Sequence, residues 1–541
     1  MSEGRTIRHP DGRVELRDPE AVRGSQLFNE DLAPVPVGRR TWTTWDYAAL
    51  WISMAHCIPT YTMASGLIGS GMSWWQALLT ILLGNLIVLA PILLNSHAGT
   101  KYGIPFPVFA RAAYGTVGSN LPALMRALVA CGWFGINCWI GGLALQTFFK
   151  SLWSGWPALL GPMTDPASSW AFGGHYPTEW VSFALFWGLN ILIVYRGMDI
   201  VRRFENIAAP YVLVMTAALV AWAIWRAHGL GAVMRDEGKF HTFGQFWPVF
   251  VPSVTAMIGF WSTLSLNMPD FTRFGRSQKE QAVGQVVALP TTMTVFALMG
   301  IVITSASAEI YGRPIWDPVE LVGMFPSRLL VAVSMFTVVV ATLGVNIAAN
   351  VVSPANDFAN LKPGKISFKT GGLITGIVGA MMLPWKLIAD PNGYIFKWLL
   401  GYSGGLGSIA GVLVADYWFV RRKRLRLGDL YRRDGVYAYG PPVGVVTEAS
   451  EATKGDGAYR DGTVPTRERA RYRGAGFNGA AIGATLFGCA LAWIGLIVKP
   501  LAVLYDYAWF VGAGGAGLLY ALLMLPERAR QMSADVTSSK L

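Results

Sequence analysis

Apolar stretches long enough to cross a bilayer recur along this chain and constrain its fold more than any other feature. A membrane-spanning helix needs roughly 20 predominantly apolar residues. Apolar residues make up 53% of the 541 and charged residues only 14%, whereas a soluble chain carries roughly a quarter charged residues. We therefore predict an all-α polytopic membrane protein with twelve transmembrane helices, at 45–68, 74–95, 121–149, 180–196, 207–226, 248–268, 283–308, 329–353, 372–389, 394–419, 477–497 and 502–525.

Two of these spans are interrupted in their middle. Span one contains WISMAHCIP at 51–59, and span six contains MIGFWSTLSLNMP at 257–269. A break at membrane depth frees backbone groups that lipid cannot satisfy, so it must face protein or a solute-filled cavity. Each break alone is also compatible with a structural kink, because Pro and Gly are common in transmembrane helices. Corresponding breaks in both halves of a chain favour the substrate and ion site of a secondary transporter.

The net charge of +12 is distributed so as to predict an orientation. With the N-terminus inside, the even-numbered connections carry most Lys and Arg residues, including the basic run at 421–426. Such residues are enriched in cytoplasmic connections, so we expect both termini to be cytoplasmic and the protein to lie in the inner membrane. The same enrichment explains the basic run without a nucleic-acid partner.

The spans divide the chain into five predicted segments. Residues 1–44 contain no apolar stretch of a cleavable signal peptide, and 437–476 contain too little apolar surface to pack. The segments are a cytoplasmic N-terminal segment at 1–44, a ten-helix transport core at 45–419, a basic and partly disordered cytoplasmic loop at 420–476, two further helices at 477–525 and a cytoplasmic tail at 526–541.

Several other functions find no support in the residues. The four cysteines, Cys57, Cys131, Cys138 and Cys489, fall within spans without metal-type spacing, and we interpret them as small packing residues. Six scattered histidines and the lack of paired intramembrane carboxylates argue against an enzyme. We therefore expect no cofactor and no metal. A channel would show pore-lining rings or filter motifs.

The breaks expose particular groups. Pro59 cannot donate a hydrogen bond and disfavours helix just before it, which frees carbonyls between Ala55 and Ile58 that can bind a cation. Gly259 permits an irregular backbone beside Phe260 and Trp261, which sets aromatic faces next to exposed amide groups. That combination suits a flat, polar ring.

Two other spans supply amide side chains on single helix faces. Trp133 and Asn137 are four residues apart in span three, and Asn346 and Asn350 repeat that spacing in span eight. An Asn in a cavity can bind the alternating N–H and C=O edge of a heterocycle, while Trp133 can stack on the ring. Each Asn alone is equally compatible with a hydrogen bond between packed helices.

Longer strings identify a family. The chain resembles the first nucleobase:cation symporter family of purine, pyrimidine, hydantoin and allantoin permeases, from about residue 28 to 435 and again in spans eleven and twelve. The matching strings are NEDLAPVP at 29–36, RTW at 40–42, GMSWWQ at 71–76, KYGIPFP at 101–107, RAAYG at 111–115, CGWFG at 131–135, NMPDFTR at 267–273 and NIAAN at 346–350.

The resemblance implies a fold and a binding site. It implies an inverted repeat of five plus five helices with two extra helices, and alternating access around a site at the membrane midplane. Trp133 and Trp261 would sandwich the ring, Asn137 and Asn350 would hydrogen-bond its edge, and the backbone near Gly259 would complete the pocket. The family often has Gln, or in some plant members Glu, at the position of Asn137.

A second departure from the family concerns the coupling ion. The resemblance implies that the sodium-coupled relative binds its cation through carbonyls matching Ala55, Ile58 and Ala341 and through a Ser-Thr pair. This chain has Gly344 and Val345 in place of that pair, and sodium needs several oxygen ligands. We therefore predict transport that does not depend on sodium.

A proton is the favoured coupling ion, and His56 in the first break is a candidate carrier. A neutral His56 bonded to a carbonyl is the alternative role, and Asp46 and Asp270 are rival carriers. The predicted substrate is an oxo-substituted nitrogen heterocycle such as uracil, hydantoin or allantoin, with cytosine, purines and thiamine left open. Sodium symport and facilitated diffusion remain alternative mechanisms.

Overall fold

The computed structural model describes residues 6–160, 174–231, 233–387, 399–449 and 466–528, and helices dominate it. Nine of the described helices are long and apolar enough to cross a membrane, and they coincide with predicted spans two to eight, ten and eleven. They are α4 (Trp74–Tyr102), α6 (Asn120–Leu152), α7 (Pro177–Tyr195), α8 (Met198–Arg226), α9 (Phe243–Phe260), α12 (Gln278–Tyr311), α14 (Arg328–Asn350) continued by α15 (Val352–Leu361), α19 (Leu400–Val414) continued to Val420, and α20 (Gly479–Trp493) continued to Leu496.

The other three spans consist of shorter helices. Span one is α2 (Thr44–Ala55) and α3 (Ile58–Gly69), span nine is α16 (Phe368–Met381) followed by α17 (Pro384–Leu387), and span twelve is α21 (Ala502–Asp506) and α22 (Ala508–Leu523). The end of span nine and the start of span ten fall in 388–398, outside the described residues. Each predicted span thus coincides with helix, and the twelve-span, five-plus-five fold is confirmed.

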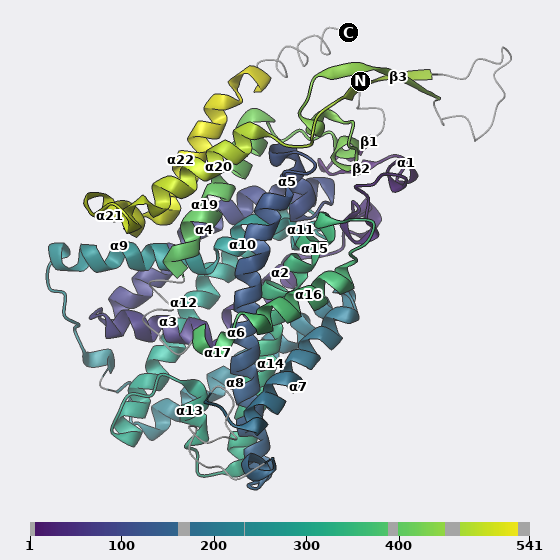
Figure 1. Ribbon diagram of the computed structural model, residues 1–541. Coiled ribbons are helices and arrows are strands. Elements are labelled where there is room, and N and C mark those ends of the chain that lie inside the picture. The colour runs from purple at the N-terminus through teal and green to yellow at the C-terminus, as the bar shows by residue number, and fades with distance from the viewer. Residues whose placement is uncertain (1–5, 161–173, 232, 388–398, 450–465, 529–541) are drawn as a thin grey trace.

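The core helices pack as two groups with α8 between them. Broken span one packs with α4 and α12, and α9 packs on α4, to form one group; α6, α7, α14 and α16 pack together in the other (Figure 1). α8 contacts α2 and α12 of the first group and α7 and α14 of the second. The two breaks lie five spans apart, in spans one and six, as an inverted five-plus-five repeat requires.

A short helix that the sequence did not predict closes one end of the core. α5 (Phe106–Tyr114) is buried along its whole length. Arg111 of α5 donates from Nε and Nη2 to Asn360 Oδ1 of α15, at 3.1 and 2.7 Å. Nine residues are too few to span a bilayer, so hydropathy gave no signal for α5. The remaining short helices are α1 (Glu20–Arg23), α10 (Ser262–Asn267), α11 (Pro269–Thr272) and α13 (Pro318–Gly323).

Part of the loop predicted at 420–476 is structured. Tyr431 and Tyr437 are fully buried, and the guanidinium group of Arg421 lies over the Tyr437 ring at 4.9 Å. β3 (Pro442–Ala449) pairs antiparallel with β4 (Thr466–Tyr472). These contacts order the described residues of the loop, and the prediction of partial disorder stays untested at 450–465, which lie outside the described part of the chain.

The N-terminal segment is also structured. β1 (Thr6–Arg8) pairs antiparallel with β2 (Val14–Leu16), and both lie at the same end of the molecule as β3 (Figure 1). The buried Arg40 side chain donates from Nε to the Val35 carbonyl at 2.8 Å and from Nη2 to the Val14 carbonyl at 2.9 Å. Burial lowers the pKa of Arg40 to about 10, so the side chain still carries the charge that strengthens these bonds at neutral pH.

Candidate functional site

The break in span one falls at His56 and Cys57. α2 ends at Ala55, Cys57 is extended with φ −135° and ψ 155°, and α3 starts at Ile58 with Pro59 in its first turn. Pro is tolerated there because the first N–H groups of a helix have no intrahelical acceptor. The predicted coupling residues Ala55, His56 and Ile58 therefore bracket the break.

The break in span six falls at Trp261, two residues later than the sequence indicated. α9 runs through Gly259 to Phe260, Trp261 has φ −102° and ψ 8°, and α10 starts at Ser262. Gly259 instead permits close packing, since a Cβ atom there would lie 2.8 Å from the Leu399 carbonyl oxygen. The expected irregular backbone at Gly259 is corrected to Trp261.

A small pocket lies where these breaks meet α6 and α14. It contains five of the six predicted substrate-binding residues, and Gly259 lies just outside it. Its volume is about 20 Å³. The lining residues are Cys57, Pro59, Trp133, Asn137, Phe260, Trp261, Thr263, Leu264, Val345, Ala349 and Asn350. Four elements distant in sequence thus converge on one site.

The two pocket asparagines are held in different ways. Asn137 donates from Nδ2 to the Trp133 carbonyl at 3.1 Å, while its buried Oδ1 has no partner among the described residues. Asn350 donates to Asn346 Oδ1 at 3.0 Å, and Asn346 donates to Asn190 Oδ1 at 3.1 Å. This amide chain joins α14 to α7 and fixes the orientation of the Asn350 side chain.

Aromatic rings form the other wall of the pocket. Trp133 and Phe260 meet edge to face with centroids 5.2 Å apart, and Phe260 and Trp261 do so at 4.7 Å. Trp51 meets Trp261 edge to face at 5.2 Å. The buried Nε1 of Trp261 has no acceptor among the described residues. Two residues that line the pocket therefore carry unsatisfied polar atoms, the acceptor Asn137 Oδ1 and the donor Trp261 Nε1.

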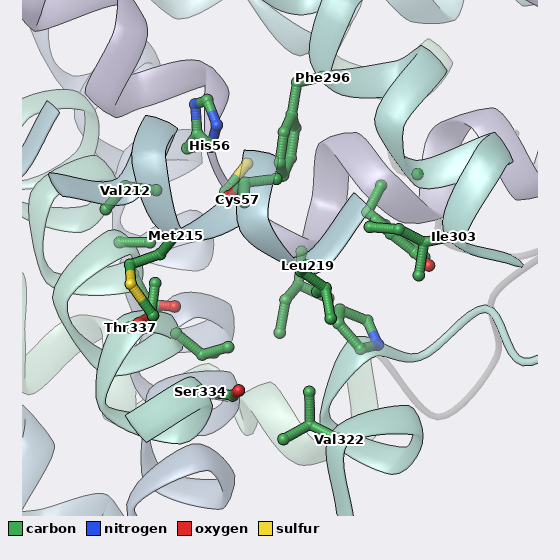
Figure 2. A pocket seen from close by; sticks show the side chains of 18 residues that line it. His56, Cys57, Val212, Met215, Leu219, Phe296, Ile303, Val322, Ser334 and Thr337 are labelled. Carbon is green, nitrogen blue, oxygen red and sulfur yellow. The ribbon is translucent and has the colours of Figure 1, made fainter. Parts of the chain in front are cut away.

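A second, larger cavity lies on the other side of the span-one break. It measures about 90 Å³, and Cys57 lines both it and the small pocket. Figure 2 shows His56 and Phe296 at one end of it and Ser334 and Val322 at the other. The predicted coupling residues His56, Ile58 and Ala341 line it, whereas Ala55 is buried and does not.

The contacts of His56 favour the neutral side chain. Nδ1 lies 3.0 Å from the Ile52 carbonyl oxygen, so it carries a proton and donates. The buried Nε2 has no partner among the described residues, and the ring packs on Phe296 at 4.2 Å. A protonated Nε2 would be an unpaired cation inside this packing, which is costly.

The rival carboxylates are engaged elsewhere. Asp46 forms a capping box with Thr43 and accepts from Arg202 Nε and Nη2 at 2.6 and 2.8 Å. Asp270 is buried, and its Oδ1 accepts from the Phe106 N–H at 3.0 Å, while its Oδ2 has no hydrogen-bond partner among the described residues. Both contacts match the capping and pairing roles expected near helix ends.

Two residues of this region escaped the sequence analysis. Tyr402 of α19 accepts from Trp133 Nε1 at 3.1 Å and donates to the Gly259 carbonyl at 3.0 Å. Glu205 is a buried carboxylic acid in α8. Span five was predicted to begin at 207, whereas α8 begins at Met198, so Glu205 lay outside the predicted span and was not considered. No group of three His, Cys, Asp or Glu residues that could hold a metal occurs in the described part of the chain.

Comparison with known proteins gives a consistent family match. The pattern of the family described as "Permease for cytosine/purines, uracil, thiamine, allantoin" matches residues 34–452. The allantoin permease of Bacillus subtilis (strain 168) is 40% identical over 504 residues, which cover 93% of this chain and 94% of that permease. The purine-uracil permease NCS1 of Arabidopsis thaliana is 36% identical over 95% of this chain and 80% of that protein.

A solved structure has the same fold. It is Mhp1, a nucleobase-cation-symport-1 family transporter in a closed conformation with bromovinylhydantoin bound. The two chains superpose with a TM-score of 0.69 at 24% identity, over 93% of this chain and 96% of Mhp1.

Proposed function

This chain belongs to the family of permeases for cytosine, purines, uracil, thiamine and allantoin, and we propose that it imports an oxo-substituted nitrogen heterocycle by proton symport. As a member of that family it is a multi-pass membrane transporter and not an enzyme. The proposed location is the inner membrane with both termini cytoplasmic. The distribution of Lys and Arg supports that orientation.

The observation that carries the substrate class is the pair of unsatisfied polar atoms on residues that line the small pocket. Asn137 Oδ1 can accept from a ring N–H, and Trp261 Nε1 can donate to a ring carbonyl. Uracil, hydantoin and allantoin present both groups on a compact ring, and Trp133 offers an aromatic face for stacking. The permeases for allantoin and for purines and uracil among the relatives support the same class.

The size of the pocket supports alternating access. A volume of about 20 Å³ is on the scale of the ~10–15 Å³ needed to hold one water. A heterocyclic ring therefore enters only when the pocket walls move apart. The walls come from both helix groups, α3, α9 and α10 on one side and α6 and α14 on the other. Relative movement of the two groups would open the site.

Two residues of α14 support a proton as the coupling ion. Gly344 and Val345 have no side-chain oxygen, and sodium needs several oxygen ligands. The second candidate mechanism, sodium symport, would require backbone carbonyls to complete a cation site. Facilitated diffusion of the same substrates is the third.

The test is uptake into vesicles containing the purified full-length chain. Labelled allantoin, uracil and hydantoin are compared, with cytosine, adenine and thiamine as the wider panel, with and without sodium and a protonophore. We expect saturable uptake of at least one oxo-substituted ring that ignores sodium and collapses with the protonophore. Stimulation by sodium would refute the proton mechanism, and absence of uptake for every ring would refute the substrate class.

A further inference from the structure

Glu205 of α8 carries a buried carboxyl group that has no role in the site described above. The side chain is only 3% exposed, and neither oxygen has a well-formed hydrogen bond among the described residues. Glu205 is the eighth residue of α8, which places it about 10 Å along the helix axis at 1.5 Å per residue. α8 is long and apolar enough to cross a membrane, and buried ionisable groups on such helices are rare and usually functional.

The carboxyl group lies in the seam between the two helix groups. A Cβ atom added to Gly344 would lie 3.3 Å from Glu205 Oε2 and would collide with Ser53 Oγ. Oε2 of Glu205 thus lies in the space beside the Gly344 backbone. Ser53 belongs to α2 in the first group, and Gly344 belongs to α14 in the second. Movement between the groups would change the surroundings of the carboxyl group.

No titratable or charged group on α8 or on the helices packed against it, α2, α7, α12 and α14, forms a salt bridge with Glu205 among the described residues. The groups on these helices are Asp46, Tyr47 and the capping His56 on α2, Glu179 and Tyr195 on α7, Lys279, Glu280, Glu309 and Tyr311 on α12, Arg328 on α14, and Asp199, Arg202, Arg203, Tyr211 and Arg226 on α8 itself. Arg202, one turn from Glu205, is bound to Asp46. Glu280 is bound to Arg276 and Glu309 to Arg235.

The larger cavity follows the same face of α8. Val212, Met215 and Leu219, which are 7, 10 and 14 residues after Glu205, line it (Figure 2). That spacing keeps them on the helix face of Glu205. The cavity continues to Pro318 and Val322 in the connection between spans seven and eight, which is external in the proposed orientation. It thus extends from near the seam toward the outside.

We propose that Glu205 binds the coupling proton, an inference that rests on the proposed proton symport. With the carrier open outward, a proton from external water binds the carboxylate and leaves a neutral acid. Removing the charge lowers the cost of burial between α2 and α14. Once the carrier opens inward, the O–H bond breaks, the proton passes to cytoplasmic water, and the carboxylate is restored. One proton crosses per cycle, and no other reactant is needed.

The first test compares Glu205→Gln with wild type in vesicles clamped at zero membrane potential, using labelled allantoin, uracil and hydantoin. The control is Glu309→Gln, which neutralises an exposed Glu paired with Arg235. A pH difference of one unit can drive up to about tenfold accumulation with one proton per substrate. We expect wild type and Glu309→Gln to approach this ratio, and Glu205→Gln to give a ratio of about one while still exchanging external for internal label.

The outcomes separate the inference from the proposed function. Proton-driven accumulation by Glu205→Gln equal to wild type would overturn the role of Glu205 and leave proton symport standing. Sodium-driven accumulation by wild type without a response to the pH gradient would overturn both. Sodium dependence lost in Glu205→Gln would reassign the carboxylate as a cation ligand.

A second measurement does not depend on any variant being active. Dicyclohexylcarbodiimide reacts with protonated carboxylic acids in apolar surroundings, and mass spectrometry locates the modified residue. We expect modification of wild-type Glu205 that rises as the pH falls, with matching loss of uptake. Absence of modification at every pH would overturn the inference.

Discussion

The indole nitrogen of Trp133 donates to the hydroxyl group of Tyr402 at 3.1 Å, and that hydroxyl group donates to the Gly259 carbonyl at 3.0 Å. One tyrosine therefore ties the stacking residue of α6 to the last turns of α9, across the two helix groups. The bond fixes the plane of the Trp133 ring at the pocket. Breaking it should free the ring and weaken substrate binding without removing any residue that lines the pocket.

Tyr402→Phe removes that hydroxyl group and keeps the ring. We expect substrate affinity to fall roughly fivefold, because one net hydrogen bond contributes about 1 kcal/mol. Substrate titration of the purified protein by tryptophan fluorescence measures the change. Tyr195→Phe, at an exposed tyrosine of α7, is the control. Unchanged affinity in Tyr402→Phe would mean that packing alone orients Trp133.

Asn350→Ala removes the pocket end of the amide chain. We expect affinity to fall by roughly 1 to 3 kcal/mol, about 5- to 150-fold, since a desolvated hydrogen bond to the ring is lost. Asn85→Ala is the matched control, because Asn85 is buried and donates to the Ile81 carbonyl of its own helix. Normal affinity of Asn350→Ala in the same titration would move the substrate site elsewhere.

Asn137 should recognise a ring N–H through its free Oδ1. An N-methylated analogue of the transported ring should therefore bind wild type roughly tenfold more weakly than the parent compound, because the acceptor is left unpaired. In Asn137→Ala both compounds should bind about equally. Competition against labelled substrate gives both ratios. A methylation penalty that persists in Asn137→Ala would assign the N–H contact to another residue.

His56→Asn keeps a donor near the position of Nδ1, which is bonded to the Ile52 carbonyl, and removes the titratable ring. We expect uptake with an unchanged pH profile, because the ring in the structure is a neutral packing group. Initial uptake rates between pH 5 and 8, the window in which an ordinary His titrates, provide the comparison. A flattened profile would make His56 a proton carrier.

Gly259→Ala should destabilise the protein through a backbone clash. The new Cβ atom would lie 2.8 Å from the Leu399 carbonyl and 3.2 Å from Ser403 Cβ. Overpacking of this kind costs about 1 to 3 kcal/mol, and we expect a lower Tm in detergent together with weaker binding. Gly244→Ala, on the same helix with open space around it, should change neither. Equal Tm values for both variants and wild type would contradict this expectation and would show that α9 and α19 can move apart to accommodate the new methyl group without loss of stability.

Hydropathy alone placed the twelve spans, because each must present apolar side chains to lipid over a fixed length. The two helix breaks, in spans one and six, were also predicted from the sequence, because residues such as Pro59 interrupt a helix through their local chemistry. Trp133, Asn137, Phe260, Trp261 and Asn350 were predicted from one-face spacing and family strings, and they do line one pocket. These features depend on neighbours within a few residues.

What the sequence missed depends on contacts between distant segments. Nothing local indicates that Tyr402 joins Trp133 to Gly259, or that Arg421 buries against Tyr437. The break of span six moved from Gly259 to Trp261 because packing against Leu399 holds Gly259 in the helix.

Glu205 separates what the sequence could predict from what only the tertiary structure decided. The sequence by itself determined a membrane transporter with two interrupted helices and an aromatic, amide-lined site, because hydropathy, breaks and helix spacing are properties of contiguous residues. Only the tertiary structure decided that Glu205 meets Ser53 and Gly344, residues more than 130 positions apart from it on either side. The proposed role of Glu205 in binding a proton depends on the helices packed around its carboxyl group, and the residues next to it in sequence do not indicate that packing.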